Sequence, residues 1–286
     1  MTYKKLIKEA TKLAIKNNKE ESAVIILLLH FAKINTASLY QNQDMEVPDD
    51  IHLAFKSALD EYLYENVPVQ YITGVESFYG YDFLVSEGCL IPRFETEELV
   101  ENVLLTYDEL FGKEKVSVVD IGTGSGCIAI TLAKEEKNMS VVATDISKEA
   151  LEMAIKNAIH LGADVEFLSG DMLEPVKGRK FDILVSNPPY IPQDEEVDPL
   201  VKDNEPNVAL FGGLDGLKFY RIILSQAKEI LNEKNFIAFE HAYDKGQEIN
   251  DLAKEYFPNA IVRLLKDMQG KDRMTIIING SGKYEN

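Results

Sequence analysis

The sequence has no tryptophan, four histidines and only two cysteines among its 286 residues. The two cysteines, Cys89 and Cys127, cannot build a disulfide framework or a cysteine-rich metal cluster. The histidines are scattered and lack the spacing that is typical of metal ligands. We therefore expect no metal site, and we expect a reducing, cytoplasmic setting for this chain.

Long apolar runs are missing as well. The longest covers residues 23–32 and is interrupted by His30. A helix needs about 20 consecutive apolar residues to cross a bilayer, so this run is too short. The sequence therefore predicts no membrane partner, although a hydrophobic content of 45% is enough for sizeable folded cores.

Basic side chains are scarce relative to acidic ones. Lys and Arg total 30 against 48 Asp and Glu, which gives a formal net charge of -18. Such a chain repels a phosphate backbone, and this argues against nonspecific binding to DNA or RNA. The length suggests one large domain, alone or accompanied by a small one.

Residues 1–66 repeat apolar side chains at helical spacing in three stretches. The first contains Leu6, the second starts at Ser22 as a candidate cap, and the third spans Ile51–Tyr64. No catalytic spacing occurs among these residues. We expect a small helical bundle that docks a partner or acts as a lid and performs no chemistry.

Residues 67–91 are rich in β-branched and aromatic side chains and are interrupted by glycines, which predicts a hairpin linker. Residues 92–286 then form the main domain. Near its start, Thr96 is a candidate N-cap for a helix through Leu99. Arg93 has two interpretations, a surface charge or part of the wall of a cofactor pocket.

From residue 116 onward, apolar strands alternate with helical segments, which is typical of an α/β fold. We predict a doubly wound, mainly parallel, seven-stranded sheet with helices on both faces. Its strands are Val116–Ile121, Val141–Thr144, Val165–Leu168, Phe181–Ser186, Phe236–Glu240, Ile261–Leu265 and Met274–Ile278.

A glycine-rich turn, Gly122-Thr123-Gly124-Ser125-Gly126, follows the first of these strands. Glycines permit a tight turn and let a ligand approach the backbone closely. Residue 127 is cysteine, so the dinucleotide pattern G-x-G-x-x-G is not met. The turn therefore predicts a nucleotide-like ligand but weakens the case for NAD.

Acidic residues end the next two strands. Asp145 can accept hydrogen bonds from both ribose hydroxyls of a nucleoside, or it can cap the following helix. Asp171 can accept from an adenine amino group, and Met172 can pack on the ring. Together with the glycine turn, these residues predict an adenosine bound across the carboxyl edge of the sheet.

The fourth strand ends in Asn187-Pro188-Pro189-Tyr190. Proline lacks an N–H and cannot continue a sheet, so the strand must stop there. The first proline biases Asn187 to an extended backbone, which can direct its amide toward a ligand. The alternative is a polar loop with a Pro-Pro turn and no chemical role.

These strand ends resemble those of class I S-adenosylmethionine (SAM)-dependent methyltransferases. The Asn-Pro-Pro-Tyr motif is similar to that of the subgroup that methylates planar nitrogens in adenine, cytosine or glutamine. Four further motifs resemble the release factor glutamine methyltransferase family, HemK/PrmC: Gln70-Tyr71-Ile72-x-Gly74, Leu90-Ile91-Pro92-Arg93-x-x-Thr96-Glu97, Glu205-Pro206-x-x-Ala209-Leu210-x-Gly212-Gly213-x-Asp215-Gly216-Leu217 and Gly270-x-Asp272-Arg273. Phe94 departs from the family, which usually has proline there.

The resemblance implies an enzyme, a SAM-dependent protein-(glutamine-N5) methyltransferase that releases S-adenosylhomocysteine. It implies that the substrate is the glutamine of the Gly-Gly-Gln loop in class 1 peptide-chain release factors. By the same resemblance, SAM is bound by Gly122, Thr123, Gly124, Ser125, Gly126, Asp145, Asp171, Met172 and Asn187. The substrate glutamine is received by Asn187, Pro188, Pro189 and Tyr190, of which Asn187, Pro188 and Tyr190 are the expected catalytic residues.

Two alternatives stay open at this point. One is an N6-adenine or N4-cytosine methyltransferase acting on nucleic acid, and the other is a SAM-binding factor without catalysis. An acidic segment after Tyr190 disfavours the first, since it would repel phosphates and attract a basic protein substrate; a solvated acidic loop would also explain it. This segment contains Asp194, Glu195, Glu196, Asp198, Asp203 and Glu205, opposed only by Lys202.

Overall fold

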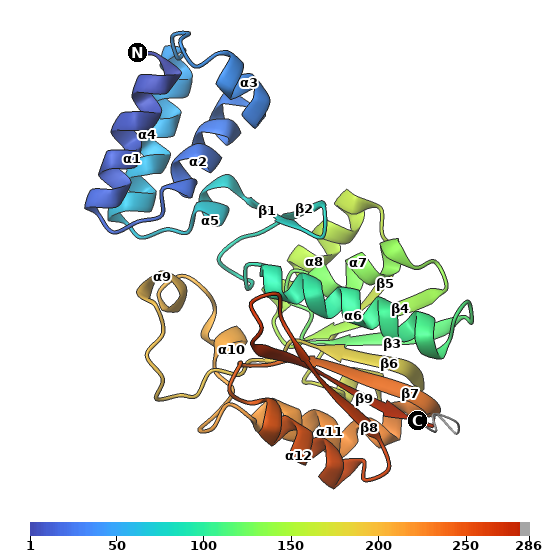
Figure 1. The fold of residues 1–286 in the computed structure, drawn as a ribbon. Helices are drawn as coiled ribbons and strands as arrows, with labels where there is room; N and C mark the ends of the chain where they lie inside the picture. Colours follow the sequence, from blue (N-terminus) through green and yellow to red (C-terminus); the bar gives the residue numbers. More distant parts are fainter. Residues whose placement is uncertain (281–286) are drawn as a thin grey trace. The chain divides into compact units, whose positions relative to one another are not determined.

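The structure, a computed structural model, describes residues 1–280, which form two compact units (Figure 1). The first contains Met1–Val75 and the short segment Asp198–Asn204. The second contains Glu76–Val197 and the chain from Glu205 onward. Asn204 anchors the short segment in the first unit, because its Nδ2 donates to the carbonyl of Asn66 over 2.8 Å. The sequence did not suggest this return of the chain.

The first unit is the expected helical bundle. Its core is formed by apolar side chains of α1, α2 and α4, among them Leu6, Leu27 and Phe55. Its helices are α1 (Tyr3–Lys16), α2 (Ser22–Ala32), α3 (Thr36–Gln41), α4 (Asp49–Tyr64), α5 (Val69–Thr73) and α9 (Pro199–Lys202). The expectation that Ser22 caps α2 is wrong, since Glu21 is the N-cap and makes no side-chain cap hydrogen bond.

A hairpin follows α5, as the sequence predicted, although α5 itself was not anticipated. Strands β1 (Val75–Phe78) and β2 (Tyr81–Leu84) form a two-stranded sheet. The connecting residues Tyr79 and Gly80 both have positive φ angles, of 51° and 77°. Two central residues with positive φ give a turn whose twist matches that of the flanking strands.

The second unit is built on a seven-stranded sheet in the order β5-β4-β3-β6-β7-β9-β8. Its strands are β3 (Val116–Ile121), β4 (Met139–Asp145), β5 (Val165–Ser169), β6 (Phe181–Ser186), β7 (Leu231–Glu240), β8 (Ile261–Lys266) and β9 (Asp272–Asn279). β9 pairs antiparallel with both β7 and β8, and all the other neighbouring strands of this sheet pair in parallel. The predicted doubly wound, mainly parallel sheet is therefore confirmed.

Helices cover both faces of this sheet, with α6, α7 and α8 on one side and α11 and α12 on the other (Figure 1). The alternation of side chains along β3 explains this, because Val118 faces the first helix layer and Val119 the second. The helices are α6 (Phe94–Leu110), α7 (Cys127–Glu135), α8 (Lys148–Leu161), α10 (Asn207–Leu210), α11 (Lys218–Ile230) and α12 (Gly246–Tyr256).

One helix start differs from the prediction. Helix α6 begins at Phe94 with Arg93 as its N-cap, so Thr96 lies inside the first turn and does not cap the helix. Thr96 is buried at 3% exposure. Its hydroxyl turns toward the sheet, where it takes part in the site described below.

Candidate functional site

The carboxyl ends of β3, β4, β5 and β6 border a cavity of about 330 Å³. This volume suits a ligand of nucleoside size. Nine of the predicted site residues line it: Gly122, Thr123, Gly124, Ser125, Asp145, Asp171, Met172, Asn187 and Pro189. Three others, Gly126, Pro188 and Tyr190, are not among its lining residues.

The glycine turn presents its backbone to the cavity. Gly122 and Gly124 have φ angles of 75° and 57°, and a Cβ atom on either would meet no atom within 4 Å. Gly126 serves a different purpose, because its Cβ would lie 2.8 Å from Ile130 and 3.1 Å from Ala154. The third glycine therefore allows close helix packing, and the first two leave open space for a ligand.

A buried carboxyl group supports this turn from beneath. Asp120 is fully buried and accepts a 2.6 Å hydrogen bond from the Thr123 hydroxyl. Burial raises the pKa of Asp120 to about 7, and the hydrogen bond from Thr123 opposes this shift only in part. The sequence gives Asp120 no signal beyond its place before the glycines.

Asp145 joins the glycine turn to the start of α8. One carboxylate oxygen accepts from the Gly124 N–H over 2.9 Å, and the other accepts from the Ser147 N–H over 2.8 Å. The alternative that Asp145 caps α8 is wrong, since Ser147 is the N-cap and accepts from Ala150. Both oxygens of Asp145 keep lone pairs for hydroxyl donors of a ligand.

The end of β5 supplies the next part of the wall. Asp171 is exposed and Met172 half-buried, and both line the same cavity. Met172 has a positive φ of 47°, and its carbonyl accepts from the Thr144 hydroxyl over 3.2 Å. This hydrogen bond fixes an unfavourable backbone conformation that presents the thioether beside the cavity.

Asn187 directly follows β6, the strand that pairs with β3. Its Nδ2 donates to the Thr96 hydroxyl over 3.2 Å, and that hydroxyl donates to Oε2 of Glu240 over 2.7 Å. Glu240 is 1% exposed, and burial raises its pKa to about 7. Sequence reasoning missed the roles of Thr96 and Glu240, because no local pattern links them to Asn187.

The residues after Asn187 are held by the segment around Phe211 and Gly212. Ile191 forms a parallel bridge with Phe211, and the Gly212 N–H donates to the Ile191 carbonyl over 2.8 Å. Pro188 is buried, and Tyr190 packs half-buried against the apolar core next to α11. The motif from Gly212 to Gly216 therefore forms the support of the Pro-Pro-Tyr turn.

Arg93 lines the cavity, which decides between its two interpretations in favour of the pocket wall. It pairs with Glu205, whose side chain is only 2% exposed and also accepts from the Ile91 N–H over 3.3 Å. Glu205 is therefore not part of an exposed acidic segment, as the sequence had suggested. The remaining members, Asp194, Glu195, Glu196, Asp198 and Asp203, are exposed.

Other residues of the wall carried no sequence signal for this role. The apolar part includes Cys89, Ile146 and Phe219. Both cysteines are buried, and no disulfide joins them. Among residues 1–280, no cluster of three or more His, Cys, Asp or Glu side chains could hold a metal ion. Within the same residues, no helix has both the length and the apolar character needed to cross a membrane.

Comparisons with known proteins agree with this architecture. Residues 99–203 match the methyltransferase small domain, and residues 5–74 match the PrmC N-terminal domain. A methyltransferase from Pyrococcus furiosus superposes with a TM-score of 0.52 and 21% identity, over 71% of this chain and 91% of its own. The hMettl16 catalytic domain in complex with the MAT2A 3'UTR hairpin 6 superposes with a TM-score of 0.54 and 14% sequence identity, over 83% of each chain. Fold and domain together define a methyltransferase.

Sequence comparison with curated proteins shows to which family of methyltransferases the chain belongs. The release factor glutamine methyltransferase of Bacillus cereus is 43% identical over 94% of this chain and 96% of its own length. That of Bacillus subtilis is also 43% identical, over 93% and 94%, and that of Staphylococcus aureus is 34% identical, over 96% and 98%. The chain belongs to the release factor glutamine methyltransferase family.

Proposed function

We propose that this protein transfers the methyl group of SAM to the side-chain amide nitrogen of a glutamine, in the Gly-Gly-Gln loop of class 1 release factors. The observation that carries the proposal is the orientation of Asn187. Its Nδ2 is engaged by Thr96, while the residue itself lines the cavity at the end of β6. Its Oδ1 is thus left as an acceptor for a planar amide.

The cavity accounts for the cosubstrate. Gly122 and Gly124 leave room for a ligand beside the backbone, and Asp145 offers acceptors for ribose hydroxyls. Asp171 and Met172 line the part that we assign to adenine. SAM, when bound, supplies a methyl group on a cationic sulfonium, an activated electrophile that needs no metal to react.

The substrate amide requires alignment more than activation, because its nitrogen lone pair is delocalised into the carbonyl. In our proposal, Oδ1 of Asn187 and the carbonyl of Pro188 each accept one N–H of the glutamine amide. These acceptors favour the positive charge that develops on nitrogen as the new bond forms. Tyr190 packs its ring against the flat amide, and the surplus proton leaves to solvent.

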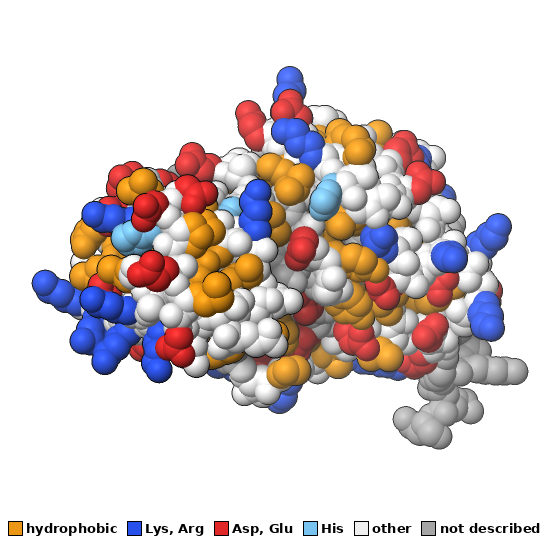
Figure 2. Space-filling view, turned by 90° about the horizontal axis from the view of Figure 1, so that it is seen from above, with side chains coloured by type: hydrophobic (Ala, Val, Ile, Leu, Met, Phe, Trp, Pro, Cys, Tyr) orange, Lys and Arg blue, Asp and Glu red, His pale blue; other side chains and the backbone are white. Residues whose placement is uncertain are grey.

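The charge of the chain favours a protein substrate over nucleic acid. The net charge is -18, and Asp194, Glu195 and Glu196 are exposed soon after Tyr190. On the face seen in Figure 2, basic side chains cluster at one end, and acidic and basic side chains are interspersed over the remainder. An acidic surface suits basic residues around a substrate loop. Docking by residues 1–66 and a cytoplasmic location stay predictions.

Mass measurement on the reaction product tests the proposal. The protein is incubated with SAM and either a class 1 release factor or DNA, and the products are analysed as peptides and nucleosides. We expect one added methyl group on the loop glutamine and none on DNA. Methylated adenine or cytosine with an unmodified release factor would instead support the nucleic-acid alternative, and no methylation of either would support a factor without catalysis.

A further inference from the structure

We infer that Thr96 and Glu240 are positioning residues that set which side of the Asn187 carboxamide faces the substrate. The catalytic consequence rests on the proposed function, but the orientation itself does not. Both residues lie outside the Asn-Pro-Pro-Tyr motif, and Glu240 does not line the cavity. They act through Asn187 and do not touch the reacting atoms.

The direction of the hydrogen bonds carries this inference. A hydroxyl group has one proton to donate, and the Thr96 hydroxyl gives it to Glu240 over 2.7 Å. The Thr96 oxygen can then only accept from Asn187, so it must face the Nδ2 side of the amide. Oδ1 is turned to the other side. Glu240 thereby determines, through the Thr96 hydroxyl, the orientation of the Asn187 side-chain amide at the cavity wall.

The sheet brings these groups together. β7 pairs with β6 in parallel, with Ser186 opposite Phe239, so Glu240 and Asn187 each follow at the same edge. The Tyr220 hydroxyl holds the Glu240 carbonyl over 2.7 Å from the opposite helix layer. The first turn of α6 then places Thr96 between the two side chains.

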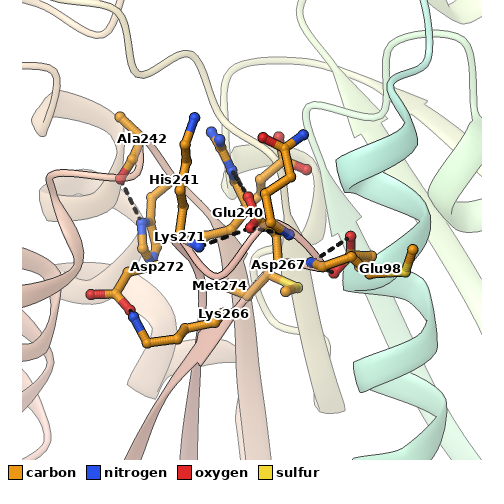
Figure 3. Close-up of polar contacts among 12 residues, drawn as sticks. Glu98, Glu240, His241, Ala242, Lys266, Asp267, Lys271, Asp272 and Met274 are labelled. Carbon is orange, nitrogen blue, oxygen red and sulfur yellow. Dashed lines mark hydrogen bonds and ion pairs between the residues drawn. The ribbon is translucent and has the colours of Figure 1, made fainter.

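Arg273, whose side chain is 15% exposed, favours the charged form of Glu240. Burial raises the pKa of Glu240 and Glu95 adds to this shift, while hydrogen bonds from Thr96 and Asn187 and the charge of Arg273 oppose it. Asp267, whose side chain is 1% exposed, pairs with Arg273 and accepts the backbone N–H groups of Gln269 and Lys271 over 2.9 Å each (Figure 3). The other ionisable groups influenced by Glu240 are Tyr190, Tyr220 and Cys127.

The turn between β8 and β9 therefore has a defined part in this arrangement. Asp272 pairs with Lys266 over 2.9 Å, and Gly270 has a φ of 80°, which closes the turn. Arg273 links the two carboxyl groups of Asp267 and Glu240, because it pairs with Asp267 and its charge also acts on Glu240. We therefore assign the motif Gly270-x-Asp272-Arg273 a positioning role: it holds Arg273, the cation that acts on Glu240, and does not contact the substrate.

Thr96→Val is the central variant, because valine keeps the shape of threonine and removes its hydroxyl. Thr96→Ser retains the hydroxyl, and Thr106→Val is the matched control, a buried threonine on the same helix. We expect Thr96→Val to lower kcat about tenfold or more, the loss of one hydrogen bond, while KM for the release factor changes little. Serine should restore kcat to within about threefold of wild type.

A readout that needs no substrate tests the orientation itself. In protein labelled with ¹⁵N-asparagine, the side-chain amide of Asn187 is assigned by its loss in Asn187→Ala. We expect its protons to exchange slowly with solvent in the wild type and in Thr106→Val, and rapidly in Thr96→Val. Glu240→Gln should also make the Asn187 amide protons exchange rapidly. A glutamine amide can donate to the Thr96 oxygen, so the Thr96 hydroxyl no longer has to donate to residue 240 and accept from Asn187.

The results separate this inference from the proposed function. An Asn187 amide that stays protected in folded Thr96→Val, or a kcat within about twofold of wild type, overturns the inference. A wild-type protein that fails to methylate release factor overturns the proposed function, but the exchange measurement still decides the orientation of Asn187.

Discussion

The carbonyl oxygen of Tyr190 occupies the space that a Cβ atom on Gly216 would need. Gly216 also has a φ of 76°, a conformation that other residues adopt at a cost. A neighbouring glycine, Gly212, is equally restricted, since its Cβ would lie 2.8 Å from the Cα atom of Tyr190. The catalytic turn therefore depends on backbone contact with a segment that has no catalytic side chain.

Gly216→Ala should displace the Pro-Pro-Tyr turn. We expect the free energy of unfolding to fall by about 2 to 4 kcal/mol, and turnover to fall with it, because strain and a backbone clash add. Gly178→Ala is the matched control, since Gly178 has a φ of 81° and open space around its Cβ position. That variant should lose only about 1 kcal/mol. Equal losses of stability and activity in the two variants would show that the clash with Tyr190 has no consequence.

The sequence predicted the sheet because its strands are long apolar runs between helical segments. It also predicted most of the cavity wall, since residues that directly follow parallel strands must meet at one edge. Thr96 and Glu240 could not be found this way, because they are 144 positions apart and their contact depends on packing. Local capping statistics made Thr96 a helix cap, and acidic composition made Glu205 a surface residue. In both cases a tertiary contact overrides the local pattern.

Asp145→Ala should weaken SAM binding by about tenfold to a hundredfold, because it removes the acceptors for the Gly124 and Ser147 N–H groups and for a ribose. Titration calorimetry with SAM measures the change. Glu152→Ala, an exposed acid on α8, is the control and should bind SAM as the wild type does. Unchanged affinity in Asp145→Ala would place the nucleoside elsewhere.

Asp120 predicts a dependence of stability on pH. Burial raises its pKa in the folded state to about 7 from a usual 3.8, so the folded protein binds the proton more tightly than the unfolded chain does. The stability that the folded protein gains from this protonation is fully present below about pH 4 and is lost as the pH rises through about 7. Glu240, with a pKa of about 7, adds a loss of the same sign.

Urea unfolding of wild type and Asp120→Asn at several pH values measures this effect. We expect the wild type to lose stability relative to Asp120→Asn by up to roughly 4 kcal/mol between about pH 4 and about pH 8. The comparison of two variants cancels the other titrating groups, including Asp215, whose pKa is lowered to about 2 by Arg221. A constant difference in stability across this range would contradict a protonated, buried Asp120.

Asn187→Ala should reduce turnover about a hundredfold or more, on the order of 3 kcal/mol, by analogy with the loss of a directed oxyanion-hole group. SAM affinity should change much less, because the glycine turn and Asp145 remain. Asn232→Ala, an exposed asparagine at the opposite end of the sheet, is the control. Turnover of Asn187→Ala within a few-fold of wild type would remove this residue from the reaction.

The most direct test of the account is a crystal structure of the protein with S-adenosylhomocysteine and a Gly-Gly-Gln peptide. We predict that the glutamine amide nitrogen lies within about 3 Å of both Oδ1 of Asn187 and the carbonyl oxygen of Pro188, and faces the sulfur of the cosubstrate. A sulfur atom that lies far from Asn187, or a glutamine bound outside this corner, would contradict the central claim.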